Sequence, residues 1–206
     1  MTTRLDLSWA LKAVIPHADK LTHDLVVLES GNGLLHAYAT NRYTFGIAQT
    51  MDEGFRFACN LSIAEATDLE RFVRPSLVGQ RTQEVILLHR DDELHVGYEG
   101  ESAVFETKPQ VFLSFEHLLG QVKMMRSLPA GRSHWVLNPD FGAKFEKAAQ
   151  KGDPMHLWHF EVQNDDNPYA ATLVAVGDNF LGGIAGLTFD RPTPNVWSWI
   201  TEEKAA

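Results

Sequence analysis

Three lysines near the end of a predicted helix have the type and spacing that most clearly suggest binding chemistry. Lys144, Lys147 and Lys151 stand three and four positions apart in the stretch LNPDFGAKFEKAAQKGDP, so a helix would align them along one edge. A row of ammonium groups can contact phosphates without reading bases. Such a row beside an apolar helix face is more often only a solvated surface, and both interpretations stay open at this point.

The other reactive side chains form weaker patterns. Nine histidines invite a metal interpretation, but His156 and His159 of HLWH lie in a predicted strand, where residues three apart point to opposite faces. His89 and His95 flank a predicted hairpin and are expected to form a surface pair across it. Cys59 has no neighbouring motif that would activate its thiol, so it is expected in the core.

Nothing in the sequence defines a catalytic centre. The DDE at residues 91–93 is more typical of a turn between strands than of a metal site, and the glycine-bearing stretches GNG and VGDNFLGG match no phosphate-binding loop. No nucleophile stands beside a base. We therefore expect a protein that is not an enzyme and uses no metal or cofactor; an enzyme with an unrecognised site is the minority alternative.

Composition narrows the class of protein. The 206 residues, 44% of them hydrophobic, suffice for one large domain or two small ones. The net charge of −9 argues against coating nucleic acid by bulk attraction. One cysteine excludes an internal disulfide, no apolar run approaches the roughly 20 residues that span a bilayer, and MTTRLDLSWALK is not a signal peptide. We expect a soluble cytoplasmic protein.

A recurring unit is expected to position these residues. Each copy runs from a short extended piece through a capped helix to a set of strands. In the first copy, LDLSWALKAVIPHADK, Ser8 is the predicted N-cap and Pro16 limits the helix. The predicted buried face consists of Leu11, Val14 and Ile15.

The second and third copies have clearer helix boundaries. In FACNLSIAEATDLERFVRP, Ser62 and Glu65 form a predicted capping box and Pro75 ends the helix. Its apolar stripe consists of Ile63, Ala66, Leu69, Phe72 and Val73.

In the third copy, HWVLNPDFGAKFEKAAQKG, Asn138 is the predicted cap and Pro139 the first helical residue. Asp140 is expected to interact with the positive end of the helix dipole, and Gly152 is expected to end the helix. The side chains predicted to face inward are Phe141, Phe145, Ala148 and Ala149.

Strand patterns follow each helix. They are LVVLES, LLHAYAT and YTFGIAQ after the first helix, EVILLHR, ELHVGYEG and SAVFETK after the second, and MHLWHFEV, AATLVAV and FLGGIAGLTF after the third. GNG and DD are predicted turns, and the alternation in ELHVGY indicates strands with one solvated face. The predicted fold class is therefore α+β with a mostly antiparallel sheet, not a βαβ Rossmann pattern.

The repeat is interrupted between the second and third copies. SFEHLLGQVKMM is predicted as an extra helix and SLPAGRS as a loop. We therefore predict a first domain at 1–107, a linker or irregular module at 108–133, and a second domain at 134–206. The C-terminal tail contains Trp197 and Trp199, so it is expected to dock on its own domain or, as the alternative, on a partner.

Three segments, in this order and spacing, resemble the sliding clamps of DNA replication, in particular the bacterial beta clamp. LKAVIPHADK to VVLESGNGLLHAYATNRYTFGIA resembles the start of a clamp domain, with Ala39-Thr40-Asn41-Arg42-Tyr43 where the family has an A-T-D-x-Y/H-R type turn. FACNLSIAEATDLERFV is similar to the second helix of such a domain. LNPDFGAKFEKAAQ to ATLVAVGDNFLGGIAGL looks like a closing half-module.

The resemblance implies a clamp fold, in which helices line a central hole and sheets form the outer wall. It implies a non-catalytic processivity factor that holds duplex DNA without reading its sequence, with a replicative polymerase and a clamp loader as partners. The residues expected to face DNA are Lys12, Lys20, Arg42, Arg71, Arg74, Lys144, Lys147 and Lys151.

The sequence also departs from the family. Beta clamps have six half-modules per chain and two-domain phage and eukaryotic clamps have four, whereas three are clear here. A compact, phage-type clamp that closes as a homo-oligomer is therefore expected, with a trimer favoured. Ile184-Ala185-Gly186-Leu187-Thr188 stands where the family has an M-P-x-R strand beside a peptide groove. The alternative function is a clamp-like regulatory protein that does not encircle DNA.

Overall fold

The structure is a computed structural model that describes residues 2–20, 24–75, 83–109, 114–127, 139–162 and 169–185. Its helices are α1 (Arg4–Val14), η1 (Ile15–His17), α2 (Ile63–Val73), α3 (Phe115–Arg126), α4 (Pro139–Ala143) and η3 (Lys144–Ala148). Its strands are β1 (Thr2–Thr3), β2 (Val26–Gly31), β3 (Leu34–Thr40), β4 (Thr44–Met51), β5 (Phe57–Leu61), β6 (Glu84–Arg90), β7 (Glu93–Tyr98), β8 (Glu101–Glu106), β9 (Met155–Val162), β10 (Tyr169–Val176) and β11 (Phe180–Ala185).

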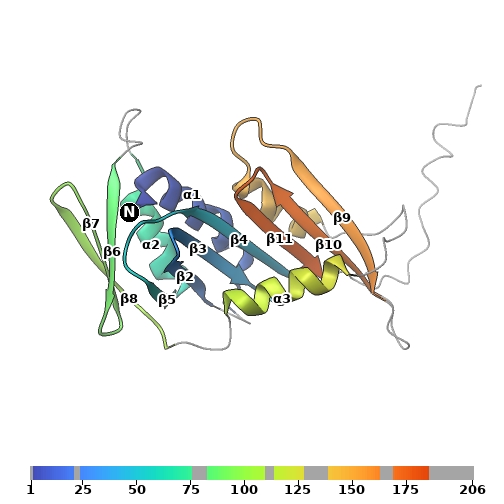
Figure 1. The fold of residues 1–206 in the computed structure, drawn as a ribbon, viewed down its shortest axis with the longest axis horizontal. Coiled ribbons are helices and arrows are strands. Elements are labelled where there is room, and N and C mark those ends of the chain that lie inside the picture. Colours follow the sequence, from blue (N-terminus) through green and yellow to red (C-terminus); the bar gives the residue numbers. More distant parts are fainter. Residues whose placement is uncertain are drawn as a thin grey trace, which may run out of the picture.

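The strands form two separate antiparallel sheets, which lie side by side in Figure 1. One has the order β1-β6-β7-β8 and the other β5-β2-β3-β4-β11-β10-β9. The short strand ahead of each of the first two helices pairs with the other repeat: β1 pairs with β6, and β5 pairs with β2. This exchange joins the first two repeats and confirms the predicted α+β class. None of the described helices is long and apolar enough to cross a bilayer.

The first helix begins earlier than predicted. The Thr3 hydroxyl accepts a hydrogen bond from the Asp6 amide at 3.1 Å and caps α1. The prediction that Ser8 is the N-cap is therefore wrong. Because the helix starts one turn earlier, Ser8 lies inside it, and its buried hydroxyl donates to Glu70 of α2 at 2.9 Å.

The second helix agrees with its pattern. The Ser62 hydroxyl accepts a hydrogen bond from the Glu65 amide at 3.2 Å, and α2 ends at Val73, before Pro75. Of the predicted stripe, Ala66, Leu69 and Val73 are fully buried.

The third helix starts as predicted and ends early. Pro139 is its first residue, whereas Asn138 lies outside the described residues. At Lys144 the helix tightens into the 3₁₀ turn η3 and stops at Ala148. The predictions for Ala149 and Gly152 are therefore wrong: Ala149 is exposed, and Gly152 lies in a later turn with a φ of +94°. A 3₁₀ turn has about three residues per turn, so it cannot continue the spacing of an α-helix.

The predicted strands are largely confirmed. β3, β6 and β9 coincide with the predicted segments, and the other bounds shift by one or two residues. Positive φ angles at Asn32 and Gly33, and at Asp91 and Asp92, mark the two predicted turns. The end of FLGGIAGLTF and the tryptophan-bearing tail lie outside the described residues.

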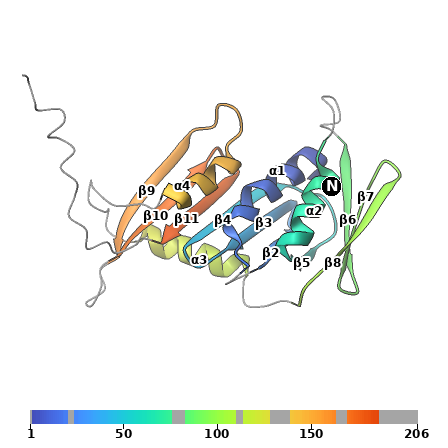
Figure 2. The same ribbon diagram turned by 180° about the vertical axis from the view of Figure 1, so that it is seen from behind.

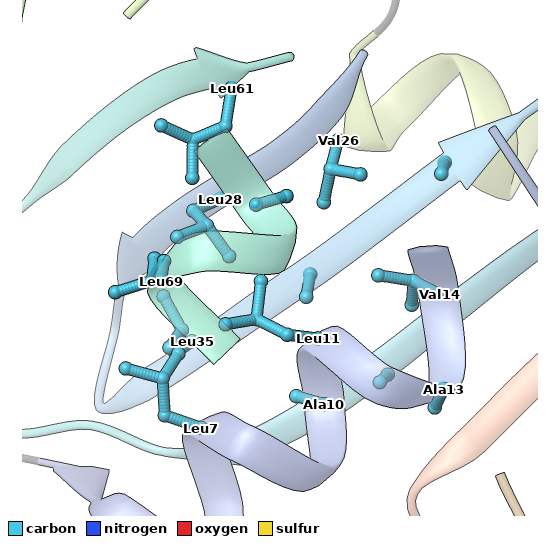
Figure 3. Packing of buried hydrophobic residues seen from close by; sticks show 14 of the residues in the cluster. Leu7, Ala10, Leu11, Ala13, Val14, Val26, Leu28, Leu35, Leu61 and Leu69 are labelled. Atoms are coloured by element: carbon cyan, nitrogen blue, oxygen red, sulfur yellow. The ribbon is translucent and has the colours of Figure 1, made fainter. Parts of the chain in front are cut away.

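Helices cover both faces of the longer sheet. α1, α2 and η3 pack on one side, here called the α1 face, and α3 packs on the other, the α3 face (Figures 1 and 2). Alternation along the strands separates the two cores: Val26 and Leu28 join the α1 side, whereas Val27 joins α3. Figure 3 shows the α1 core, with α1 and α2 side chains against those of the sheet: Leu7, Ala10, Leu11, Ala13, Val14, Val26, Leu28, Leu35, Leu61 and Leu69.

Three glycines allow β4 and β11 to join the first and third repeats. Gly182 stands opposite Gly46, and Gly183 stands opposite Phe45. A Cβ on Gly182 would lie 2.5 Å from a ring carbon of Phe145 and 2.6 Å from the Phe45 carbonyl oxygen. Side chains at this glycine seam (Gly46, Gly182 and Gly183) would displace the rings that cover it. The longer sheet contains strands from both 1–107 and 134–206. The division of the chain into two domains at these residues stays a prediction.

α3 holds the seam from the opposite face. Leu118 belongs to a cluster with Ile47 of β4, whereas Val122 and Met125 belong to a cluster with Leu173 of β10. The extra helix predicted at 114–125 is thus confirmed, and it bridges both sides of the β4–β11 junction.

Glu70 joins α1 to α2 through polar contacts. It is 5% exposed, accepts the Ser8 hydroxyl hydrogen bond, and accepts two more from the Arg74 guanidinium, one of them from Nε at 2.9 Å. Burial opposes ionisation of this carboxyl, but the hydrogen bonds from Arg74 and Ser8 outweigh it and hold the Glu70 pKa below its usual value. Glu70 is therefore ionised in the folded protein at neutral pH.

Gly182→Ala should lower the free energy of unfolding by about 1–3 kcal/mol, because the new methyl group must displace Phe145 or the β4 backbone. Urea unfolding monitored by circular dichroism measures the change. Gly120→Ala in α3 is the matched control, since a Cβ there meets nothing within 4 Å; it should be neutral or stabilise by up to about 1 kcal/mol. Equal effects at the two positions would contradict a tightly packed seam.

Glu70→Gln should lower the free energy of unfolding by about 1–3 kcal/mol, because it removes the charge from a buried carboxylate that accepts three hydrogen bonds. Asp68→Asn, in the same helix, is the control. Its ion pair with Arg71 is solvent-exposed, so its loss should cost less than about 1 kcal/mol. If both variants unfold at the same urea concentration, the Glu70 contacts do not stabilise the helix pair.

Candidate nucleic-acid interface

The three helices of the α1 face lie side by side. The Trp9 indole nitrogen of α1 donates a hydrogen bond to the Ala148 carbonyl of η3 at 3.0 Å, and Ser8 of α1 donates to Glu70 of α2. Figure 2 shows α1 between α2 and the α4–η3 segment. The three helices therefore lie together on one side of the longer sheet.

Four predicted DNA-facing lysines are exposed at this surface or in adjoining turns. Lys12 lies on α1 and acts electrostatically on Glu70. Lys147 lies on η3, Lys151 in the turn after it, and Lys20 in the turn after η1. Within the residues that the structure describes, none of these four lysines forms an ion pair.

Arg42 occupies the turn between β3 and β4. It is exposed and has a φ of +74°, in the left-handed region. The adjacent Tyr43 ring stacks on Phe141 of α4, with 5.9 Å between centroids. This contact places the Arg42 turn beside the third repeat. The sequence prediction named Arg42 but not the Tyr43–Phe141 contact beside it.

The two arginines of the second repeat already have carboxylate partners. Arg71 Nη1 lies 2.9 Å from an Asp68 carboxylate oxygen, and Arg74 binds Glu70 through two nitrogens. The helix also carries Glu65, so α2 is not basic overall. The candidate cations of the α1 face therefore lie mainly on α1, on η3 and in the adjoining turns.

Lys144 is held differently from the other lysines. It is half-buried, with its ammonium nitrogen 6.0 Å from the centre of the Phe141 ring. Burial lowers the Lys144 pKa, and Asp19 partly offsets this effect. The prediction that Lys144, Lys147 and Lys151 share one helix edge is wrong, because the helix ends at Ala148.

The reactive side chains that sequence analysis set aside have local partners. His159 Nδ1 lies 3.1 Å from the Thr172 hydroxyl, and His156 stacks on Trp158. His89 and His95 do not pair, contrary to expectation, because each lies opposite a leucine in the β6–β7 register. In the described part of the chain, no three His, Cys, Asp or Glu side chains gather as a metal site.

Cys59 is buried, as expected for a core thiol, and burial raises its pKa to about 12. The thiol is therefore protonated and unreactive at neutral pH.

A pocket of about 240 Å³ opens on the α3 face. Its wall includes His36, Ile47 and Gln49 of the sheet, Phe115 and Leu119 of α3, and the β10–β11 turn. In the segment compared with the family's groove strand, Ile184 is buried in the α1 core, and 186–188 lie outside the described residues. The pocket described above lies under the start of α3.

Comparison with known proteins addresses the fold. No family model and no curated protein matches the sequence. Solved structures do match it. A DnaN sliding clamp (DNA polymerase III subunit beta) from Pseudomonas aeruginosa, bound to griselimycin, gives a TM-score of 0.61 at 10% identity and covers 91% of this chain and 64% of that one.

Two further structures agree. A putative DNA polymerase III beta subunit from Eubacterium rectale gives a TM-score of 0.56 at 8% identity, covering 91% of this chain and 64% of that chain. The beta subunit from Thermotoga maritima gives 0.52 at 10% identity, with 89% and 63% covered. This chain thus spans less than two thirds of the length of these clamps. At such low identity the likeness concerns fold alone, and it confirms the fold that the sequence resemblance implied: the chain has the clamp fold of the DNA polymerase III beta subunits.

Proposed function

We propose that this chain is a DNA sliding clamp, a non-catalytic processivity factor that surrounds duplex DNA as a ring of several copies. The observation that carries the proposal is the side-by-side arrangement of α2, α1 and η3 on one face of two antiparallel sheets. A ring of such units directs its helices to a shared channel and its sheets outward. Topological linkage then retains DNA without base contacts.

The exposed cations fit this role. Lys12, Lys147 and Lys151, with Lys20 and Arg42 at the margins, supply sequence-independent phosphate contacts. Arg71 and Arg74 contribute only by exchanging their carboxylate partners for phosphates. A small number of phosphate contacts suits a protein that must slide, because each contact has to break at low cost.

Ring closure requires additional copies. Among the described residues, β8 pairs only with β7 and β9 only with β10, so each of these strands has one edge without a described partner. Met155, Leu157 and Trp158 of β9 are 43%, 47% and 47% exposed, which is unusual for an edge strand left in water. Edges at opposite ends of one molecule can join head to tail, and such contacts close into rings. We favour a trimer.

The proposed protein partners are a replicative polymerase and a clamp loader. With the α1 face toward DNA, the α3 face points outward, and its pocket at His36 and Phe115 is accessible to a partner segment. The proposed location is the cytoplasm, where a replication protein meets its DNA.

A second function is favoured by the charge of α2. Glu65, Asp68 and Glu70 outnumber Arg71 within this helix, which suits a clamp-like regulator that binds a replication protein and does not encircle DNA. The oligomeric mass in solution distinguishes the two functions. A closed ring, once loaded, stays on circular plasmid and slides off after linearisation; a regulator shows no such difference.

Lys147→Glu combined with Lys151→Glu should weaken binding to duplex DNA by about tenfold or more at 0.1 M salt. The slope of log affinity against log salt should fall in magnitude by about 2, since each lost phosphate contact removes about 0.9. Fluorescence anisotropy with a labelled duplex, measured over a salt series, provides both values.

The matched control is Lys123→Glu combined with Arg126→Glu, which makes the same charge change on α3, the opposite face. We expect this variant to keep the salt slope of the unmodified protein. If the two double variants lose the same affinity and slope, binding reflects net charge, and the α1 face is not the DNA-binding surface.

A further inference from the structure

His17 is the side chain on which the parts of the glycine seam converge. It ends η1 and is fully buried. Its ring centroid lies 4.7 Å from that of Phe145 in η3 and 6.0 Å from that of Phe180 in β11. A Cβ on Gly46 of β4 would lie 2.5 Å from the His17 ring. One imidazole therefore touches the first repeat on one side and the third repeat on the other.

Among the residues that the structure describes, the imidazole has no polar partner: neither Nδ1 nor Nε2 of His17 makes a hydrogen bond with any of them. A neutral imidazole carries one N–H donor and one acceptor nitrogen, so both are unsatisfied in the closed seam. Groups of this kind are rare in folded proteins and favour any rearrangement that admits water.

The surroundings of His17 also disfavour a positive charge on its ring. From η3, Lys144 brings a second cation, and Asp19 acts on that lysine from the turn after η1. β4 and β11 contribute Gly46 and Phe180, which carry no charge. Burial, and then repulsion by Lys144, lower the His17 pKa from 6.5 to about 3. Protonated His17 is therefore incompatible with the closed seam at mildly acidic pH.

We infer that His17 is an acid-sensitive latch: proton uptake by its imidazole separates β11 and η3 from β4 and α1. Once these elements part, water solvates both ring nitrogens. α3 packs on both sides of the junction from the opposite face, so it keeps the first and third repeats together and acts as the hinge. The seam opens on the α1 face, and this inference holds whether or not the chain encircles DNA.

The direction and size of the pH effect follow from linkage. Opening restores an ordinary histidine pKa near 6.5, so the open state binds one proton more than the closed state at lower pH. The population of the open state should stay constant above pH 6.5. Below that it should rise up to about tenfold per pH unit, until the pH approaches the pKa of the closed form.

Hydrogen–deuterium exchange of the full chain between pH 7.5 and 5.0 tests the latch. After correction for intrinsic exchange rates, amide protection in β4 and β11 should fall by about tenfold between pH 6 and 5. Protection in β6 and β7 should not change. Unchanged protection in β4 and β11, or an equal fall in all strands, would overturn the inference.

Two variants test whether His17 is responsible. His17→Leu and His17→Asn both remove the titrating ring, and either should make seam protection independent of pH in this range. The Asn variant retains a polar side chain and serves if the Leu variant does not fold. His95→Gln, at a half-exposed histidine of β7, should keep the pH dependence of the unmodified protein. A pH dependence that persists without His17 assigns the effect to another group.

Discussion

The close approach of β4 to β11 is the contact on which the longer sheet depends. Gly46 and Gly182 face each other across it, which brings aromatic rings close to the backbone: His17 and Phe145 on one face, and Phe45 beside Gly183 on the other. Without this contact the third repeat would lose its place beside α1, and the three helices would no longer share one surface. Rings packed on glycine stabilise the β4–β11 contact from the α1 face, and side chains of α3 stabilise it from the other.

Much of the local structure could be predicted from the sequence, because it depends on residues close to one another along the chain. The Ser62 cap, the alternation in β6 and β7, and the Asp91–Asp92 turn are of this kind. The Ser8 cap was mispredicted because the residues ahead of Ser8, from Arg4 onward, are themselves helical. The pairing of β4 with β11 carries no local signal, although the Gly182–Gly183 pair marks a strand where other groups approach the backbone.

The types of residue in the candidate interface could be predicted, but not which of their charges are buried or paired. The spacing of Asp68 from Arg71 and of Glu70 from Arg74 is that of helix ion pairs, and this could have been recognised before the structure. The lowered pKa of Lys144 could not, since it depends on burial of the side chain and on Asp19 from a distant turn. Lys151 left the predicted row because a 3₁₀ segment replaced the last helical turn. The number of exposed cations without a carboxylate partner on this surface is therefore smaller than its number of lysines and arginines.

The order of the strands in the longer sheet has a consequence for synthesis of the protein. β4 leaves the ribosome early, yet its neighbour β11 is made only after α3, α4 and β10. At about 5–20 residues per second, this interval is on the order of ten seconds. During that time the β4 edge of each nascent chain lacks its native partner, and the finished β11 of an adjacent chain on the same message can take the vacant place. Exchange of the third repeat between neighbouring polypeptides is therefore the characteristic misassembly of this topology.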